Sequence, residues 1–270
     1  MLLELKHVSQ SYAARRVLRD LSFALNTGDI GCLLGPSGCG KTTVLRAIAG
    51  FEPITGGEIV LNGELVSAPG FIVPTEKRRI GMVFQDYALF PHLNVAANVG
   101  FGLHGQSRIE RNKRVEELLQ TVGLEGSGQA YPHELSGGQQ QRVAVARALV
   151  NDPEILLADE PVGNLDSISA EHVMDSFEEI NMTDRKTVIL VTHDAKYLPY
   201  AHRVIYMRDG VVRRIVVNPE KVQIKRTKPG ETIVTEIEQL ARLYPYAEPI
   251  ELKVKSLVNF ATQAIGFSAT

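Results

Sequence analysis

The sequence predicts an α/β fold built around a mostly parallel sheet. Two continuous apolar runs of strand length, residues 155–158 and 187–191, are typical of strands covered on both faces. A third apolar stretch, residues 29–35, leads into a glycine-rich loop, and a helical pattern follows at residues 41–49. Strands that alternate with helices along the chain indicate this fold class.

The other elements of the core follow from local patterns. Residues 2–9 alternate between apolar and polar side chains, and residues 57–63 and 79–84 are also strand-like. Asp209 and Gly210 lie between two apolar stretches, which predicts a hairpin turn.

Two regions have mainly helical patterns. From about residue 86 to residue 151 the sequence is mostly helical, and Ser136 with Gln139 three residues later has the spacing of a capping box. Residues 235–243 and 250–265 are predicted to form two helices separated by Pro245 and Pro249, and the second of them carries an apolar stripe. We therefore expect a main domain at residues 1–217, with a helical subdomain at about 86–151, and a small, mainly helical extension at 218–270.

Composition excludes several classes of protein. The chain has 270 residues, 44% of them hydrophobic, and a net charge of -2, which argues against a general nucleic-acid binder. No apolar run approaches the roughly 20 residues that cross a bilayer. Glu4 and Lys6 interrupt the first apolar stretch, so we expect no secretory signal and a cytosolic protein.

The glycine-rich loop carries the first chemical motif. Residues 35–42 read Gly-Pro-Ser-Gly-Cys-Gly-Lys-Thr and match the phosphate-loop pattern G-x-x-x-x-G-K-[ST]. Glycines allow backbone N–H groups to surround a phosphate, the lysine reaches the β and γ oxygens, and the threonine hydroxyl binds Mg²⁺. The alternative, an ordinary glycine turn, does not explain the lysine and threonine. The candidate nucleotide-binding residues are Gly35, Pro36, Ser37, Gly38, Cys39, Gly40, Lys41, Thr42 and Thr43.

The two cysteines, Cys32 and Cys39, predict free thiols rather than a disulfide, because such frameworks use more cysteines. Cys39 lies inside the phosphate loop, so a bulky adduct there should exclude nucleotide. We expect maleimide to inactivate the protein and bound ATP to slow the reaction.

An acidic pair ends the apolar run at residues 155–158. Asp159 is a candidate for the magnesium shell, and Glu160 for orienting or deprotonating the attacking water. Alone, two acids after a strand would be a solvated strand end, but together with the phosphate loop they favour catalysis.

Further motifs identify a family resemblance. The sequence Leu-Ser-Gly-Gly-Gln at residues 135–139, followed by Gln-Gln-Arg-Val, resembles the signature of ABC ATPases. The other landmarks of that family follow in the required order over about residues 2–215: Tyr12 for adenine stacking, Gln85 in the glutamine loop, the Gly-Asn-Leu-Asp segment at 163–166, and His193 as the switch histidine.

The resemblance implies a P-loop core with a parallel sheet, an N-terminal antiparallel β subdomain and an inserted helical subdomain. It also implies ATP and Mg²⁺ as cofactors and an ATPase coupled to membrane transport. The catalytic residues would be Glu160, His193, Lys41 and Gln85, and the metal-binding residues Thr42, Gln85 and Asp159. In that family two subunits form a homodimer or heterodimer that encloses ATP, so Ser136, Gly138 and Gln139 of one chain would cap the γ-phosphate held by the other.

The resemblance divides between two kinds of transporter. Residues to about 157 resemble ferric-ion and polyamine importer subunits, whereas residues from about 158 resemble lipoprotein-release and macrolide-efflux ATPases. Residues 218–270 depart from the longer β-rich end of ferric importers. A non-transport ABC protein is a further alternative, but the sequence has one cassette and no heptad run. A catalytically inactive cassette is disfavoured because Glu160 and His193 are both present.

The implied partners are transmembrane permease subunits and, for an importer, a periplasmic substrate-binding protein, with this chain at the cytoplasmic face of the membrane. In the family, a groove beside the glutamine loop receives a coupling helix of the permease. Here this groove would be formed by residues from Gln85 to about Leu103, with Tyr87, Leu89, Phe90 and His92 as its lining. The alternative is that Leu89 and Phe90 pack inward. Because this segment belongs to the importer-like part, we expect an importer-type permease.

Overall fold

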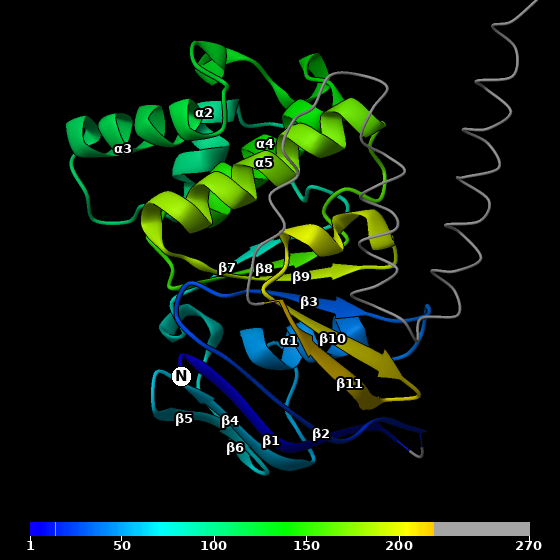
Figure 1. Ribbon diagram of the computed structural model, residues 1–270. Coiled ribbons are helices and arrows are strands. Elements are labelled where there is room, and N and C mark those ends of the chain that lie inside the picture. The colour runs from blue at the N-terminus through cyan, green and yellow to red at the C-terminus, as the bar shows by residue number, and fades with distance from the viewer. Residues whose placement is uncertain (14, 219–270) are drawn as a thin grey trace, which may run out of the picture. The chain divides into compact units, whose positions relative to one another are not determined.

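The computed structural model describes residues 1–13 and 15–218, and these residues form two sheets with helices around them (Figure 1). The predicted helices at 235–243 and 250–265 lie outside the described residues. The larger sheet has the strand order β11-β10-β3-β9-β8-β7, in which β10, β3, β9, β8 and β7 are parallel and β11 pairs antiparallel with β10. Its strands are β3 (Ile30–Leu34), β7 (Ile80–Val83), β8 (Ile155–Asp159), β9 (Thr187–Thr192), β10 (Arg203–Arg208) and β11 (Val211–Val217). The predicted α/β fold is therefore confirmed.

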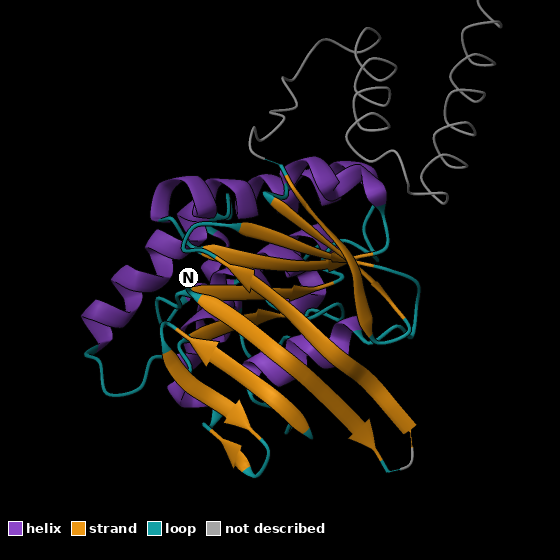
Figure 2. Ribbon diagram, turned by 60° about the horizontal axis from the view of Figure 1, so that its bottom comes forward, coloured by secondary structure: helices purple, strands orange, loops and turns teal. Residues whose placement is uncertain are grey.

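The second sheet is antiparallel and has the order β2-β1-β4-β5-β6 (Figure 2). Its strands are β1 (Leu3–Tyr12), β2 (Arg15–Leu25), β4 (Gly56–Leu61), β5 (Glu64–Ala68) and β6 (Phe71–Ile72). The pairing of β1 with β2 shifts register several times, which accommodates left-handed residues such as His7 and Asp20. This sheet is the antiparallel subdomain that the family resemblance implied.

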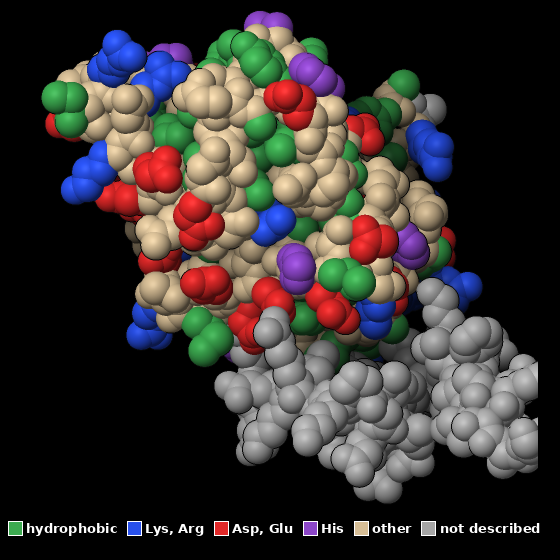
Figure 3. Space-filling view, turned by 90° about the horizontal axis from the view of Figure 1, so that it is seen from above, with side chains coloured by type: hydrophobic (Ala, Val, Ile, Leu, Met, Phe, Trp, Pro, Cys, Tyr) green, Lys and Arg blue, Asp and Glu red, His purple; other side chains and the backbone are tan. Residues whose placement is uncertain are grey.

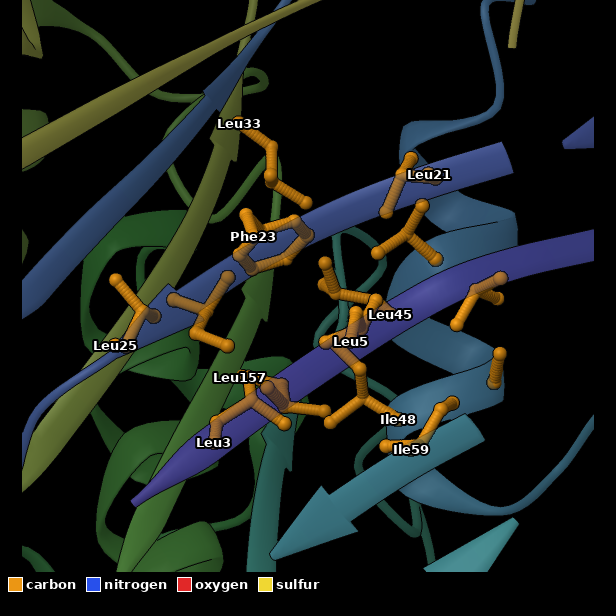
Figure 4. Packing of buried hydrophobic residues seen from close by; sticks show 14 of the residues in the cluster. Leu3, Leu5, Leu21, Phe23, Leu25, Leu33, Leu45, Ile48, Ile59 and Leu157 are labelled. Atoms are coloured by element: carbon orange, nitrogen blue, oxygen red, sulfur yellow. The ribbon is translucent and has the colours of Figure 1, made fainter. Parts of the chain in front are cut away.

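The main core lies between the two sheets and encloses α1 (Lys41–Ala49). Leu3 and Leu5 of β1 meet Leu45 and Ile48 of α1, and Leu157 contributes from β8 (Figure 4). The alternation of β1 directs one set of side chains into this core. The continuous apolar sequence of β8 fits a strand that is buried on both faces.

Helices cover the opposite face of the parallel sheet (Figure 1). They are α2 (Val95–Val99), α3 (Arg108–Thr121), α4 (Gly137–Leu149) and α5 (Ser167–Asp184), with short 3₁₀ turns η1 (Thr75–Lys77), η2 (Gly100–Gly102), η3 (Ser127–Gln129), η4 (Pro132–Glu134) and η5 (Ala195–Tyr200). Each of the four helices begins at an Asn, Ser or Asp whose side chain accepts a hydrogen bond from the first turn. The capping box predicted at Ser136 and Gln139 is present.

The hairpin predicted at Asp209 and Gly210 joins β10 to β11, and both residues have the positive φ that such a turn requires. Among the helices of residues 1–13 and 15–218, none combines the length and the apolar character that crossing a bilayer would require.

Candidate active site

The glycine-rich loop connects the carboxyl end of β3 to the amino terminus of α1. Its last glycine, Gly40, is the N-cap of α1, with a φ of 103° and no side-chain hydrogen bond to the first turn. That φ favours glycine, and the uncapped first turn leaves N–H groups that carry the positive end of the helix dipole. The loop is open at Gly38, where an added Cβ would meet no atom within 4 Å. The loop therefore has the geometry of an anion-binding cradle.

Lys41 lies within this cradle rather than in solvent. The residue is only 5% exposed, and its Nζ donates hydrogen bonds to the carbonyl oxygens of Gly35 at 2.7 Å and Pro36 at 3.1 Å. These bonds fold the side chain back over the loop. The ammonium group is thereby held where a phosphate bound to the loop would need a cation.

Thr42 and Asp159 meet at the mouth of the loop. The Thr42 hydroxyl donates to the Asp159 carboxylate, with 3.2 Å between Oγ1 and Oδ1. Burial raises the pKa of Asp159, and the hydrogen bond from Thr42 opposes that shift. A hydroxyl and a carboxylate side by side are the oxygen ligands that Mg²⁺ prefers, so these residues fit a Mg²⁺–nucleotide complex.

Glu160 and His193 follow the neighbouring parallel strands β8 and β9, so they meet at the same edge of the sheet. Glu160 Oε2 lies 3.2 Å from His193 Nδ1. Glu160 has a φ of 47°, and its N–H donates to the carbonyl of Val191 at 3.0 Å. That unusual backbone conformation turns the chain sharply after β8 and aims the carboxylate toward the histidine.

Gln85 approaches the same place from β7, which pairs with β8 on the other side. A Cβ added to Gly163 would lie 3.6 Å from both Gln85 Nε2 and Glu160 Oε2, so the amide and the carboxylate face a common space. The structure thus gathers the predicted site residues of the core around the loop: Lys41, Thr42, Gln85, Asp159, Glu160 and His193. Their roles in catalysis remain a prediction.

The signature residues lie at the amino terminus of α4 and contact other elements. Ser136 Oγ accepts from the Gln139 N–H at 3.3 Å, and the Gln139 amide oxygen accepts from the Ser136 N–H at 2.9 Å. The side chain of Gln139 is therefore occupied in capping the helix. An added Cβ would lie 2.9 Å from the Tyr87 hydroxyl at Gly137 and 2.7 Å from the Ser169 Cβ at Gly138. Only glycine allows this close approach of α4 to Tyr87 and α5.

Tyr12 lies at the end of β1, beside the first turn of α1. Its hydroxyl interacts with the side chains of Thr43 and Glu52, and burial raises its pKa. The residue is 42% exposed. The structure therefore places this aromatic side chain next to the phosphate loop, and adenine stacking stays a prediction.

The Cys39 thiol is buried beneath the loop, with the residue only 5% exposed, and burial raises its pKa. We therefore expect maleimide to inactivate the protein slowly, at a rate roughly tenfold or more below that of an exposed cysteine, because the thiolate is scarce and reachable only when the loop opens. Bound ATP should slow the reaction further. The measurement is the loss of nucleotide binding with time of exposure to maleimide.

Cys39→Ala provides the control for this reaction and should resist inactivation. The second thiol, Cys32, is fully buried, and burial raises its pKa to about 12, so it should not react in the folded protein. Equal inactivation of Cys39→Ala would contradict the assignment to Cys39.

Sequence reasoning did not identify several polar residues that hold the site in place. Arg78 donates to five oxygens, including the carbonyls of Ala47 and Ile48 at the end of α1. Burial lowers its pKa to about 10. Gln141 of α4 is fully buried and donates to the carbonyl of Pro161, directly after Glu160, at 2.7 Å.

Two more residues of this kind, Asn98 and Arg147, bind the segment after Gln85. The available signal was a polar residue within an otherwise apolar helix face, since such a residue must find a hydrogen-bond partner inside the protein. The sequence does not indicate which carbonyl groups those partners are.

The chain is similar to known proteins in its sequence and in its fold. Residues 18–163 match the family model described as ABC transporter. The chain is 48% identical over 215 residues to the Fe(3+) ions import ATP-binding protein FbpC 2 of Pectobacterium atrosepticum, covering 77% of this chain and 61% of that protein. It is 40% identical over 272 residues to the spermidine/putrescine import ATP-binding protein PotA of Vibrio parahaemolyticus, covering 97% of this chain and 71% of that protein.

Among solved structures, the chain is similar to the dimeric ATP-binding cassette MJ0796 bound to ADP and Pi. The TM-score is 0.72 and the sequence identity 37%, over 80% of this chain and 98% of that one. The chain spans about three fifths of the length of the first curated relatives that it matches, with coverage of 58%, 61% and 58%.

Proposed function

Since this chain belongs to the ABC transporter family, we propose that it is the ATP-hydrolysing subunit of a membrane transporter. The observation that carries the proposal is the contact of Glu160 with His193 at 3.2 Å, beside a phosphate loop that holds Lys41. A carboxylate paired with a histidine next to an anion cradle is suited to activating water against a phosphate.

The residues of the chain divide the reaction between them. The N–H groups at the start of α1 and the Lys41 ammonium bind the phosphates, and Thr42 with Asp159 would hold Mg²⁺. Bound there, Mg²⁺ neutralises negative charge on the phosphate oxygens. Glu160 accepts a hydrogen bond from the attacking water, while His193 and Gln85 orient the water and the γ-phosphate. Glu160 and Gln85 can both act on the same water because their side chains face the same space beside Gly163.

The site is completed by a second subunit, in a homodimer or heterodimer. Ser136, Gly138 and Gln139 lie at the start of α4, a helix of 13 residues whose dipole favours an anion at that end. In the dimer these residues of one subunit cap the γ-phosphate bound by Lys41 of the other. Loss of the γ-phosphate removes the bridging anion, so the dimer opens and moves the permease.

The transporter is an importer, most simply of the ferric-ion type. Relatives with 42–48% identity are named as Fe(3+) import proteins, and others with 40–42% identity as spermidine/putrescine import proteins. The match to FbpC 2 spans 215 residues, so it extends beyond the importer-like part that ends at about residue 157. This supports an importer over the exporter that the later residues resemble. The subunit would work at the cytoplasmic face of the membrane, with permease subunits and a periplasmic substrate-binding protein.

Reconstitution in liposomes tests this assignment. The subunit is combined separately with a ferric-importer permease, a polyamine-importer permease and a lipoprotein-release permease, and ATP-dependent uptake and ATPase activity are measured. Stimulation by the ferric-importer permease is expected. Stimulation by the lipoprotein-release permease alone would overturn the importer assignment.

We infer that the permease contacts the surface that follows Gln85. Four rings form this aromatic surface: Phe90, His92, Phe101 and His104. The ring centres of Phe90 and Phe101 are 4.4 Å apart. The His92 ring meets Phe90 edge-on with 6.1 Å between the ring centres, and the His104 ring meets Phe101 edge-on at 6.5 Å. Phe90 is half-buried, whereas His92 and Phe101 are exposed. Figure 3 looks onto the helical end of the molecule, where acidic, basic and hydrophobic side chains are interspersed. A partner on such a surface is recognised by individual side chains rather than by one charged field.

We expect the double substitution His92→Glu and Phe101→Glu to lower permease stimulation about tenfold while basal ATPase activity changes little. Exposed aromatic groups at an interface centre contribute energies of this size, and neither side chain belongs to the hydrolytic cluster. Met182→Glu, which also places a charge at an exposed apolar residue but near the end of α5, serves as the control. If both changes reduce stimulation equally, the aromatic surface is not the permease site.

A further inference from the structure

The segment that follows Gln85 is attached to the helices rather than to the sheet from which it comes. Arg147 of α4 donates to the carbonyl oxygens of Ala88 at 2.6 Å and Tyr87 at 3.0 Å. Asn98 of α2, which is fully buried, donates to the carbonyl oxygens of Phe90 and Leu93 and accepts from the Phe90 N–H. The chain therefore passes from the core sheet to the helical part within a few residues of Gln85.

The backbone bound by Arg147 has an uncommon conformation. Tyr87 and Ala88 are consecutive non-glycine residues with φ values of 58° and 50°, in the left-handed region. Such residues persist only where surrounding contacts hold them. The guanidinium group donates one hydrogen bond to each of these two carbonyl oxygens, which accept in the directions that this conformation gives them, so Arg147 stabilises the turn directly.

Arg147 also contacts an aromatic ring beside this turn. Burial lowers the pKa of its guanidinium group, and the group also lies 5.9 Å from the centre of the Phe90 ring. Arg147 thus contacts the turn at Tyr87 and the aromatic surface at Phe90 at the same time. Because the guanidinium group is planar and its donors have a fixed fork geometry, it cannot move with the turn without also moving relative to the Phe90 ring.

The same turn contacts the beginning of α4. The Tyr87 hydroxyl lies beside Gly137, next to the helix cap Ser136. Gly137 and Arg147 are separated by ten residues of one helix, or about 15 Å. Tyr87 therefore contacts α4 at two levels: its hydroxyl lies beside Gly137, and its carbonyl accepts a hydrogen bond from Arg147.

We propose that Arg147 is a positioning residue that makes the turn after Gln85, the aromatic surface and α4 move as one body. The inference rests on the proposed function. A change at Gln85 when nucleotide binds is then transmitted to the permease side at Phe90 and to Ser136 together. Without Arg147, the turn loses these two hydrogen bonds to α4, and nucleotide binding at the loop moves the aromatic surface less.

The chain contains no tryptophan, so a single introduced tryptophan reports on this surface alone. Phe101→Trp places the reporter at an exposed position, against the Phe90 ring. In the full chain carrying Glu160→Gln to prevent hydrolysis, we compare the reporter parent with variants that also carry Arg147→Met, Arg147→Lys or Arg142→Met. Tryptophan emission is recorded with and without Mg²⁺-ATP, and ATP affinity and thermal unfolding are measured on the same samples.

Arg142→Met is the matched control. Arg142 belongs to the same helix, burial lowers its pKa as well, and it donates to the carbonyl oxygens of Val122 at 3.0 Å and Gly123 at 3.1 Å. It differs from Arg147 in binding the end of α3 instead of the turn after Gln85. A loss of helix packing alone would affect both variants.

In the parent and in Arg142→Met, ATP is expected to change the emission. In Arg147→Met the ATP-induced emission change should be at least about threefold smaller than in the parent, while ATP affinity stays within about twofold of the parent. Arg147→Lys keeps one donor group, so its emission change should lie between those of the parent and Arg147→Met. Equal responses of Arg147→Met and Arg142→Met, or a parent that binds ATP without an emission change, would overturn the inference. Failure of the parent to bind ATP would overturn the proposed function and this inference with it.

Discussion

Replacing Glu160 with glutamine is expected to lower ATP turnover by about 10²- to 10⁴-fold, the contribution of a general base, while ATP binding is retained. Glutamine keeps the shape of the side chain but cannot accept the proton of the attacking water. The contacts that bind phosphate, at Lys41 and the start of α1, are untouched. Steady-state phosphate release and equilibrium ATP binding measure the two effects separately.

The same variant tests the proposed dimer. Because the γ-phosphate is not removed, the Glu160→Gln protein should elute as a dimer with ATP and as a monomer without it in size-exclusion chromatography. Glu154→Gln is the control: Glu154 precedes the other end of β8 and forms an ion pair with Arg79 at 2.9 Å. Its loss should leave turnover nearly unchanged. A Glu160→Gln variant that stays monomeric with ATP and hydrolyses it normally would contradict the catalytic assignment.

Replacing Lys41 with alanine should weaken ATP binding itself by roughly 10- to 150-fold, the effect of losing about 1.5 to 3 kcal/mol of charge-assisted hydrogen bonding. Lys41 is the buried cation of the phosphate loop, held by the carbonyls of Gly35 and Pro36. Titration of the monomeric protein with a fluorescent ATP analogue measures the change.

Ser136→Arg is the contrasting variant for that experiment. A bulky cation at the start of α4 opposes the helix dipole and should block the dimer interface that we propose, but it leaves the phosphate loop of the same subunit intact. Nucleotide affinity of the monomer should be preserved, and ATP-dependent dimerisation should be lost. If both variants lose monomer affinity equally, the role of Ser136 in the partner's site is wrong.

Local sequence was sufficient for the elements that build the core of the site. The apolar runs predicted β8 and β9, and the capping residues predicted the start of α4, because burial on two faces and N-terminal capping are both properties of short segments. The phosphate loop was equally predictable, since a positive φ at Gly40 and the lysine that follows it are neighbours in the chain.

Contacts between distant segments could not be predicted in the same way. The pairing of β1 with both β2 and β4, with its register shifts, depends on which strands meet in space. Sequence analysis also left open whether Phe90 packs inward, and the structure shows it half-buried between Phe101 and Arg147.

The sequence by itself determined the fold class, the phosphate loop, and the order of the motifs that identify the family, because each of these is encoded in neighbouring residues. Only the tertiary structure decided that the Cys39 thiol is buried, that Gln141 donates to the carbonyl of Pro161, and that Arg147 holds the turn after Gln85. The physical reason is that a buried polar group must find a hydrogen-bond partner inside the protein. For these side chains the partner is a backbone carbonyl, and because every residue carries one, the sequence does not show which residue provides it.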